Sequence, residues 1–470
     1  MQQKPSLMTN GASHAEHALA TPAGITNDLL EKHATPASAF RWVALLCAVL
    51  VVLGVVGVVL RMSDGVSDKT VWGYYAALFV FILSTAQAAP MVAIATRLAK
   101  GHWRRPISRI AEMFTAVGVL NLLLFIPLLW VLPSLEDGRR SLWFFGNRDI
   151  PGYGYAPHLW ATLALLFLVI GGIAMLWVSC LPDLAAIRDH STGRRQRIAR
   201  RMARGWQGTT RQWEMLDRRV GILGAYYFMM LVFVHFLISV DFAIALVPGW
   251  IDALFPATQA FTSLQGGAAT VLLTMIVLRK AGYREYIELD QFWSLGKLLM
   301  AMSLLWFWFW FSSFNILWYG RKPNEQAVLD LFITGPYFWM FITTFMLNFV
   351  VPFFLMIWNP IRKSIWGPTL VASGVLIGTL LDRVRIYVAA FSIPGEDAAA
   401  HLLEQSPETV TPELADILIW AGGLGGVVLV FMLVARLVPV ISIWEQTELL
   451  LYKVHKKFHR TEVLVLGKPE

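Results

Sequence analysis

The chain has 470 residues, of which 57% are hydrophobic and only 15% are charged, and its mean hydropathy is +0.57. About a quarter of the residues of a soluble protein are charged. This composition therefore excludes a string of ordinary soluble domains and favours one helical bundle in lipid. The net charge of +8 is concentrated in loops between apolar runs, which is the pattern of membrane orientation and not of nucleic-acid binding.

The N-terminal segment is polar and mixed in charge, with no apolar stretch before Phe40, so it does not read as a signal peptide. We predict that residues 1–41 form a flexible cytoplasmic tail. The first membrane helix is then its own insertion signal.

Ten apolar runs follow, and each is long enough to cross about 30 Å of hydrocarbon as an α-helix. Closed β-barrels need short segments of alternating hydrophobicity, whereas these runs are long and continuous. The predicted fold class is therefore an all-α integral membrane protein. The ten predicted membrane helices cover residues 42–61, 71–96, 111–133, 157–181, 219–247, 254–278, 293–317, 335–358, 366–391 and 416–438.

Lys and Arg are concentrated in the loops after the second, fourth, sixth and eighth predicted helices, most densely in the basic loop 182–218. The loop 392–415 is acidic instead. The positive-inside rule then places both termini, including the C-terminal tail 439–470, in the cytoplasm and the acidic loop in the periplasm. The membrane domain is 42–438. Its basic loop either touches anionic lipid or docks a cytoplasmic partner.

Ionisable side chains inside membrane segments are costly, so each is a candidate functional residue. They divide into an outer group and an inner pair, as a redox-linked proton path would require. The outer group also fits structural ion pairs, in which Asp382 pairs with Arg385 and Asp241 with Arg383. The outer group is His158, His235, Asp241, Asp382, Arg383 and Arg385, and the inner pair is Glu112 and Lys297. His235 is of special interest, because an imidazole in mid-membrane can titrate near neutral pH and relay protons.

Redox cofactors can be tested by counting ligands. The two cysteines, Cys47 and Cys180, cannot supply the four thiolates of an iron–sulfur cluster. A bundle with two bis-histidine haems needs four axial histidines, but only His158 and His235 lie inside predicted membrane helices. We therefore predict no haem, iron–sulfur cluster or metal site in this chain. If it takes part in electron transfer, it binds a diffusible carrier and passes electrons to a partner subunit.

A tryptophan-rich stretch contains Trp306, Trp308 and Trp310. A spacing of two residues does not keep side chains on one face of a helix. We therefore expect lipid-facing or packing aromatic surface here in preference to a cofactor site.

Seven motifs follow one another across the predicted helices, in an order and at spacings that resemble the NrfD/polysulfide-reductase membrane-subunit family. Within that family, the chain is most similar to the larger of the two such subunits in bacterial alternative complex III. The likeness covers about residues 72–448. The motifs are RRPISRIAEMFT (104–115), CLPDLAAIRD (180–189), RGWQGTTRQW (204–213), HFLISVDFAIALVPGW (235–250), LGKLL (295–299), LLDRVRIYV (380–388) and PVISIWE (439–445).

The resemblance implies two four-helix bundles with two flanking helices, no haem, and a quinol or menaquinol bound near the outer face. It implies an inner membrane of a bacterium and three kinds of partner: an iron–sulfur subunit of the molybdopterin-oxidoreductase type, multihaem cytochromes c, and a second NrfD-like subunit. Proton translocation would pass through polar positions of the family. The matching residues here are Glu112, His235, Asp241, Lys297, Asp382 and Arg383.

Two positions depart from the family's pattern. Related subunits have a histidine at the outer end of helix 3 and an aspartate near the start of helix 4, both at the quinol. Trp130 and Ala161 stand at those places here. His158, one helical turn before Ala161, is a replacement base, and Trp130 is a possible pocket wall.

Three functions therefore remain open. The first is a quinol-interacting subunit, in which His158 or His235 is the base and Asp241 or Asp382 accepts the proton next. The second is a non-catalytic anchor whose quinol site has been lost. The third is a secondary transporter, which would be supported by a pair of discontinuous helices.

Overall fold

A computed structural model describes residues 21–132, 156–394, 403–458 and 461–466. These residues are almost entirely helical, and eight helical segments are long and apolar enough to cross a membrane. The predicted helical membrane fold is confirmed to that extent. The eight segments are Phe40–Ser63, His102–Val131, His158–His190, Thr210–Leu246, Phe255–Tyr283, Leu289–Gly320, Phe338–Ile357 and Leu414–Leu437.

The other two predicted membrane segments are helical as well, but each differs from these eight. The segment predicted over 71–96 is divided into a short turn, Thr70–Trp72, and the helices α4 (Gly73–Ser84) and α5 (Met91–Leu98). The ninth forms one helix, α17 (Trp366–Phe391), whose second half carries an aspartate and two arginines.

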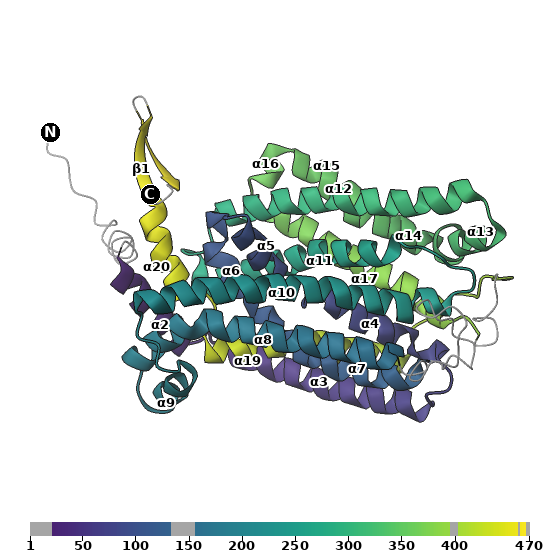
Figure 1. Cartoon of the computed structure of the whole chain (residues 1–470), viewed down its shortest axis with the longest axis horizontal. Helices are drawn as coiled ribbons and strands as arrows, with labels where there is room; N and C mark the ends of the chain where they lie inside the picture. The colour runs from purple at the N-terminus through teal and green to yellow at the C-terminus, as the bar shows by residue number, and fades with distance from the viewer. Residues whose placement is uncertain (1–20, 133–155, 395–402, 459–460, 467–470) are drawn as a thin grey trace, which may run out of the picture.

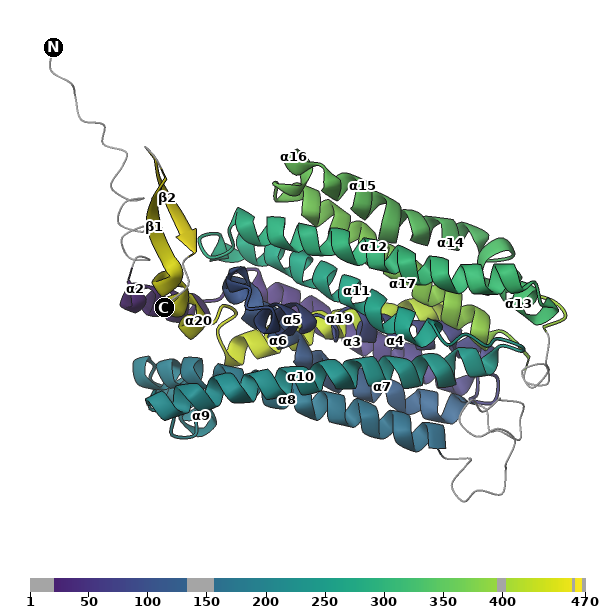
Figure 2. The same cartoon turned by 45° about the horizontal axis from the view of Figure 1, so that its top comes forward.

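The long helices lie side by side (Figures 1 and 2). Helices α11, α12, α14, α15 and α17 pack against one another, α8 packs with α7 and α10, and α3 pairs with α19. Helices α4 and α5 lie between these groups: α4 contacts α17, α11, α7 and α19, and α5 contacts α10 and α11. The bounds not yet given are α3 (Phe40–Ser63), α6 (Arg105–Met113), α7 (Val117–Val131), α8 (Ala156–His190), α10 (Thr210–Phe242), α11 (Phe255–Leu278), α12 (Leu289–Gly320), α14 (Phe338–Phe345), α15 (Val351–Ile357), α16 (Asn359–Arg362) and α19 (Leu414–Leu437), with 3-10 or π-helical turns over His102–Arg104, Phe114–Ala116, Ile244–Leu246, Arg279–Tyr283, Asp330–Thr334 and Met346–Val350.

Short helices mark the two ends of the bundle. The helices α2 (Pro22–Ala34), α9 (Gly193–Met202) and α20 (Ile443–Tyr452) lie together at one end, and α13 (Pro323–Leu329) lies at the other (Figures 1 and 2). We call the first the basic end, because α9 is rich in arginine, and the second the far end. Since α2 and α20 contact each other, the described beginning and end of the chain share the basic end.

The break between α4 and α5 is buried against α11. A Cβ atom at Gly266 or Gly267 would lie 2.5 or 2.7 Å from the backbone of this turn, so only glycine permits such close contact. The hydroxyl group of Tyr227 donates a hydrogen bond to the main-chain carbonyl of Gln87, at 2.5 Å. A neighbouring helix therefore supplies a hydrogen bond to the backbone of the unwound turn, since buried backbone groups need hydrogen-bond partners.

Parts of both predicted tails are ordered into secondary structure. Within the predicted N-terminal tail, α2 begins after Thr21, whose side chain caps the helix by accepting a hydrogen bond from the Gly24 N–H at 3.1 Å. It buries Ile25, Leu29 and His33, so residues 22–34 are not the flexible chain that their polarity suggested. Beyond α20, β1 (Lys453–Phe458) and β2 (Thr461–Leu466) form an antiparallel hairpin. Residues 1–20 of the predicted tail, and Glu396 and Asp397 of the acidic loop, lie outside the described residues.

Candidate functional site

A cavity of about 80 Å³ lies between α11, α12, α13 and α17, toward the far end. We call it the α11–α17 cavity. Asp382 and Arg385 from α17 and Gln259 from α11 supply polar surface. Mostly apolar walls with a few polar groups are typical of small-molecule sites. The aromatic wall residues are Trp250, Phe255, Trp306, Trp310, Phe314 and Phe332.

Asp382 lies between two arginines of its own helix. Its Oδ1 is 2.7 Å from Arg385 Nη2, and its Oδ2 is 3.1 Å from Arg383 Nη1. Residues three apart on a helix share a face, so the predicted pair of Asp382 with Arg385 is confirmed. Among the described residues, the ion-pair partner of Arg383 is Asp382 and not the predicted Asp241.

Arg383 is completely buried and is hydrogen-bonded through all three guanidinium nitrogens. Nε donates to Ser84 Oγ and Nη2 donates to Thr262 Oγ1, both at 3.1 Å, and Nη1 donates to the side-chain oxygen of Gln259. A buried charge is tolerated only when it is paired and hydrogen-bonded in this way. Arg383 therefore joins α4, α11 and α17 around the inner wall of the cavity.

Three further polar side chains lie where α10 faces α17. His235 and Ser239 are one turn apart on α10, and Tyr387 is one turn beyond Arg383 on α17. His235 lies within electrostatic range of Arg383, and the hydroxyl groups of Ser239 and Tyr387 face each other. His235 Nε2 and both hydroxyl oxygens are buried, without a hydrogen bond of good geometry to any described residue. These groups form a polar strip leading away from the α11–α17 cavity.

The other predicted outer residues do not line this cavity. Asp241 is buried near the end of α10. His158, on α8, donates from Nε2 to the Leu129 carbonyl at 2.9 Å. The side chain of Trp130 is 60% exposed, whereas Ala161 is fully buried, and neither lines this cavity, so the role of Trp130 as a pocket wall stays a prediction. The cavity therefore does not lie at Trp130 and Ala161, the helix 3 and helix 4 positions at which the family resemblance places the quinol.

The predicted inner pair is not a pair. Glu112, on α6, accepts a hydrogen bond from Ser179 Oγ at 2.7 Å and lies 3.6 Å from Arg109 Nε. Lys297, on α12, places its Nζ 4.1 Å from the centre of the Trp293 ring. Glu112 is therefore part of a different set of charges.

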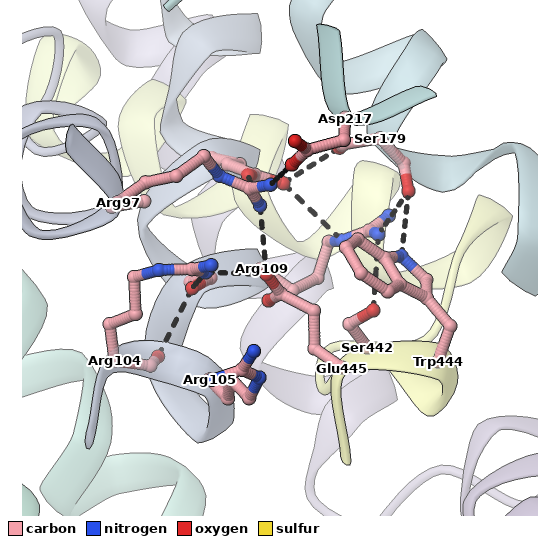
Figure 3. Close-up of polar contacts among 12 residues, drawn as sticks. Arg97, Arg104, Arg105, Arg109, Ser179, Asp217, Ser442, Trp444 and Glu445 are labelled. Carbon is pink, nitrogen blue, oxygen red and sulfur yellow. Dashed lines mark hydrogen bonds and ion pairs between the residues drawn. The ribbon is translucent and has the colours of Figure 1, made fainter. Parts of the chain in front are cut away.

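That set fastens α20 to the basic end of the bundle (Figure 3). Glu445, in α20, accepts hydrogen bonds from Arg97 at 2.8 Å and Arg104 at 2.5 Å. Burial favours the neutral acid, but the guanidinium groups of Arg104 and Arg97 prevail and hold the pKa of the Glu445 carboxyl below its usual value. Asp183, in α8, lies 3.0 Å from Arg109 Nη2 and also accepts the first N–H of α20, from Ile443, at 3.0 Å. A carboxylate at a helix N-terminus is favourable.

Sequence reasoning missed most of this arrangement. The arginines of the motif 104–115 were counted only as orientation signals. Asp183 lies just beyond the predicted run 157–181, but the apolar residues LAAI that follow it gave a signal that the helix continues and that Asp183 has a buried partner. Gln259 and Trp310 gave no signal, because an uncharged residue in an apolar run does not reveal which helix face it occupies.

The described residues bring together no group of three or more His, Cys, Asp or Glu side chains that could hold a metal ion. Comparisons of the chain with protein-family models and with curated proteins found no match.

Proposed function

We propose that the chain is a quinol-binding membrane subunit of a respiratory or photosynthetic electron-transfer complex, of the NrfD/polysulfide-reductase type, and that the quinol ring binds in the α11–α17 cavity. One observation carries this proposal. Trp310 Nε1 and Arg385 Nε are buried N–H donors on residues that line the cavity, and neither has a hydrogen-bond partner among the described residues. A quinone carbonyl or quinol hydroxyl oxygen would satisfy them, and the aromatic walls suit a planar ring.

Oxidation of a quinol releases two electrons and two protons, so a proton acceptor must lie within hydrogen-bond reach of each hydroxyl. Asp382 and Asp252 are the carboxylates that line the cavity. Asp252 accepts hydrogen bonds from the Leu254 and Phe255 N–H groups and from the Ser313 hydroxyl group, and Asp382 takes the role of first acceptor. The hydroxyl and imidazole groups of Tyr387, Ser239 and His235 would carry the proton onward within the chain, and Arg383, which keeps its proton, stands beside them as a fixed positive charge. The two cysteines cannot hold an iron–sulfur cluster, so the electrons pass to a partner.

The setting of this reaction is the cytoplasmic membrane of a bacterium. The eight apolar helices suit a multi-pass protein, and the arginine-rich basic end takes the cytoplasmic side by the positive-inside rule. The cavity then faces the periplasmic half. The resemblance supplies the partners: an iron–sulfur subunit of the molybdopterin-oxidoreductase type, multihaem cytochromes c and a second NrfD-like subunit.

Binding of a short-chain naphthoquinone to the purified chain tests the proposal. Trp310→Phe keeps the aromatic wall but removes one donor. Loss of one hydrogen bond of about 1 kcal/mol should weaken binding about fivefold, as measured by calorimetric titration. Trp308→Phe is the matched control, because Trp308 is on the same helix but 64% exposed. Equal affinities of the two variants for the naphthoquinone would show that quinol does not bind in this cavity.

A non-catalytic anchor is the second candidate. It is favoured by the outward side chain of Trp130 and by the apolar Ala161 at the places where related subunits contact quinol. The anchor predicts no saturable naphthoquinone binding to the wild-type chain. A transporter is less well supported, because the α4–α5 break is filled by α11 and by the Tyr227 hydroxyl group and does not line the α11–α17 cavity.

A further inference from the structure

A larger cavity lies at the basic end, on a different side of the molecule from the α11–α17 cavity. It has a volume of about 440 Å³ and lies between the junction of α2 with α3, the end of α11 and the end of α19. We call it the elbow cavity. Its lining residues are mainly apolar. Two of them, Val277 and Val428, lie on helices that can cross the membrane, and their exposed fractions are 63% and 43%. The cavity therefore opens toward lipid.

Three basic side chains meet at one edge of the elbow cavity. His33 and Arg436 line it, and Arg195, from α9, places Nη2 2.5 Å from His33 Nδ1. His33 is 5% exposed, and its Nε2 has no hydrogen bond of good geometry to a described residue, although the Arg436 carbonyl lies nearby. The buried His33 imidazole can thus form a further hydrogen bond at the edge of an apolar cavity.

The charge at this edge is not balanced by the protein. Lys32, which also lines the cavity, is neutralised by Asp28 at 2.8 Å and Glu285 at 3.3 Å. Arg195 and Arg436, in contrast, form no ion pair with any described carboxylate, and each lies in the other's repulsive field. Burial, followed by these two arginines, lowers the pKa of His33 to about 4, so the imidazole is neutral near pH 7. Arg195 and Arg436 therefore leave uncompensated positive charge beside the neutral His33 imidazole, and an external anion would balance it.

We propose that the elbow cavity binds an anionic phospholipid of the cytoplasmic leaflet, with its phosphate between Arg195 and Arg436 and an acyl chain along α11 and α19. A phosphate supplies the missing negative charge and accepts from several N–H groups at once. The apolar volume and the opening toward lipid select a phospholipid over a free phosphate ion. Basic pockets between membrane helices on the cytoplasmic side bind anionic headgroups in this way.

The occupant would also link three parts of the chain. Arg195 belongs to the basic loop, Arg436 to the last membrane helix, and His33 to α2. A bound phosphate therefore holds α2 and α9 against the bundle. This gives the basic loop a specific lipid contact in place of a diffuse attraction to the membrane surface.

Native mass spectrometry of the full chain in detergent, after removal of lipid, tests the proposal. Phosphatidylglycerol and phosphatidylcholine with the same acyl chains are titrated separately. We expect tighter binding of phosphatidylglycerol, weakened about fivefold by Arg195→Gln and again by Arg436→Gln, since each arginine near an anionic lipid contributes about that factor. Arg200→Gln is the matched control, because Arg200 is exposed on the same helix as Arg195.

A second variant protects the test against a general loss of structure. Val428→Trp narrows the apolar part without touching the arginines, and it should weaken both lipids. Unchanged phosphatidylglycerol affinity in the Arg195→Gln/Arg436→Gln double variant would overturn the proposal. Equal affinities for the two lipids in the wild-type chain would also overturn it, as would complete competition by inorganic phosphate or by a neutral isoprenoid quinone.

Discussion

Asp382 combines two features that rarely occur together in a membrane helix. Both of its carboxylate oxygens are held by arginines, yet the residue lines a cavity. The two arginines share the one carboxylate of Asp382, and their other N–H groups donate to neutral oxygens of Ser84, Gln259, Thr262 and the Phe332 carbonyl, which explains how three charged residues persist inside a bundle. The cavity explains why the cluster is more than a structural pair: a ligand there would meet fixed charges that need no rearrangement.

The candidate site was only partly predictable from the sequence, for reasons specific to each residue. Asp382 and Arg385 could be found because a charge inside an apolar run is conspicuous. Trp310 could not, because its neighbour Trp308 has the same chemistry and only the turn of α12 decides which of them faces inward. Trp130 does not line the α11–α17 cavity, and matching a helix position to a family does not fix the face on which it lies.

His235→Ala tests the proton route at the scale of one residue. His235 does not line the α11–α17 cavity, so its loss should leave KM for quinol unchanged. Removal of a proton acceptor should lower quinol:acceptor turnover in the assembled complex about a hundredfold. The matched control is His158→Ala: His158 contacts the Leu129 carbonyl and does not line the α11–α17 cavity, so its loss should leave turnover intact. Normal turnover of His235→Ala in fully assembled complex would exclude this route.

At the scale of helices, hydropathy located the eight apolar membrane-length helices and the helical segments over 71–96 and 366–391, but not the break inside 71–96. Residues 85–90 (TAQAAP) are less apolar than their flanks, but the run as a whole is apolar enough to be taken as one helix. The break packs against Gly266 and Gly267, which are distant in the sequence. Helix α2 was missed because a short polar segment gives no membrane signal, and its order comes from packing against α20. Hydropathy measures partition into lipid, whereas breaks and surface helices are decided by contacts between elements.

The pairing of α3 with α19 depends on glycines at the contact. A Cβ atom at Gly422 would lie 2.4 Å from the Cα of Gly54, so the two backbones touch, as small residues in membrane helices permit. Gly422→Ala should force the helices apart and destabilise the chain by about 1–3 kcal/mol. Thermal unfolding in detergent measures this. Gly221→Ala is the control, since nothing lies within 4 Å of a Cβ there; an equal effect of both would show that the contact is unimportant.

Glu445 should make the docking of α20 dependent on pH. Its pKa in the folded chain is below the ordinary value of 4.5, so the carboxylate stabilises the docked helix above about pH 4.5, and this contribution disappears as the pH falls through the lower, folded value. Proteolysis of the C-terminal segment should therefore accelerate below pH 4.5.

Glu445→Gln should cause the same release at every pH and cost about 3 kcal/mol, because it removes the ion-pair partner of the buried Arg104 and the nearest carboxylate of Arg97, which keeps only Glu112 at 3.8 Å and Asp217 at 4.0 Å. Glu448→Gln provides the comparison. Glu448 pairs with Arg105 at 2.9 Å, but its side chain is 34% exposed whereas that of Glu445 is 2% exposed, so loss of the Glu448 pair should cost less than loss of Glu445. Similar proteolysis of the two variants would show that the buried cluster does not hold α20.

On the scale of the whole molecule, two groups of charge carry the proposals. One is the cluster on α17 beside the α11–α17 cavity, and the other is the basic end, where α2, α9 and α20 meet the bundle (Figure 1). A further group joins the end of α3 to the start of α19, where Arg61 pairs with Glu413 at 3.0 Å and Asp416 at 2.8 Å. The apolar spans between them suit lipid. Under the proposals above, the small molecule binds in the half away from the basic end, and the basic end makes the lipid contact.

Photolabelling with an azido-naphthoquinone, followed by mapping of the labelled peptides, tests the central claim most directly. Quinol bound in the α11–α17 cavity should place the label on the second half of α12, around Trp310, or on residues 328–333, and an excess of unlabelled quinone should abolish it. Label concentrated around His158 and Trp130 would contradict this, because the quinol would then occupy the helix 3 and helix 4 region instead.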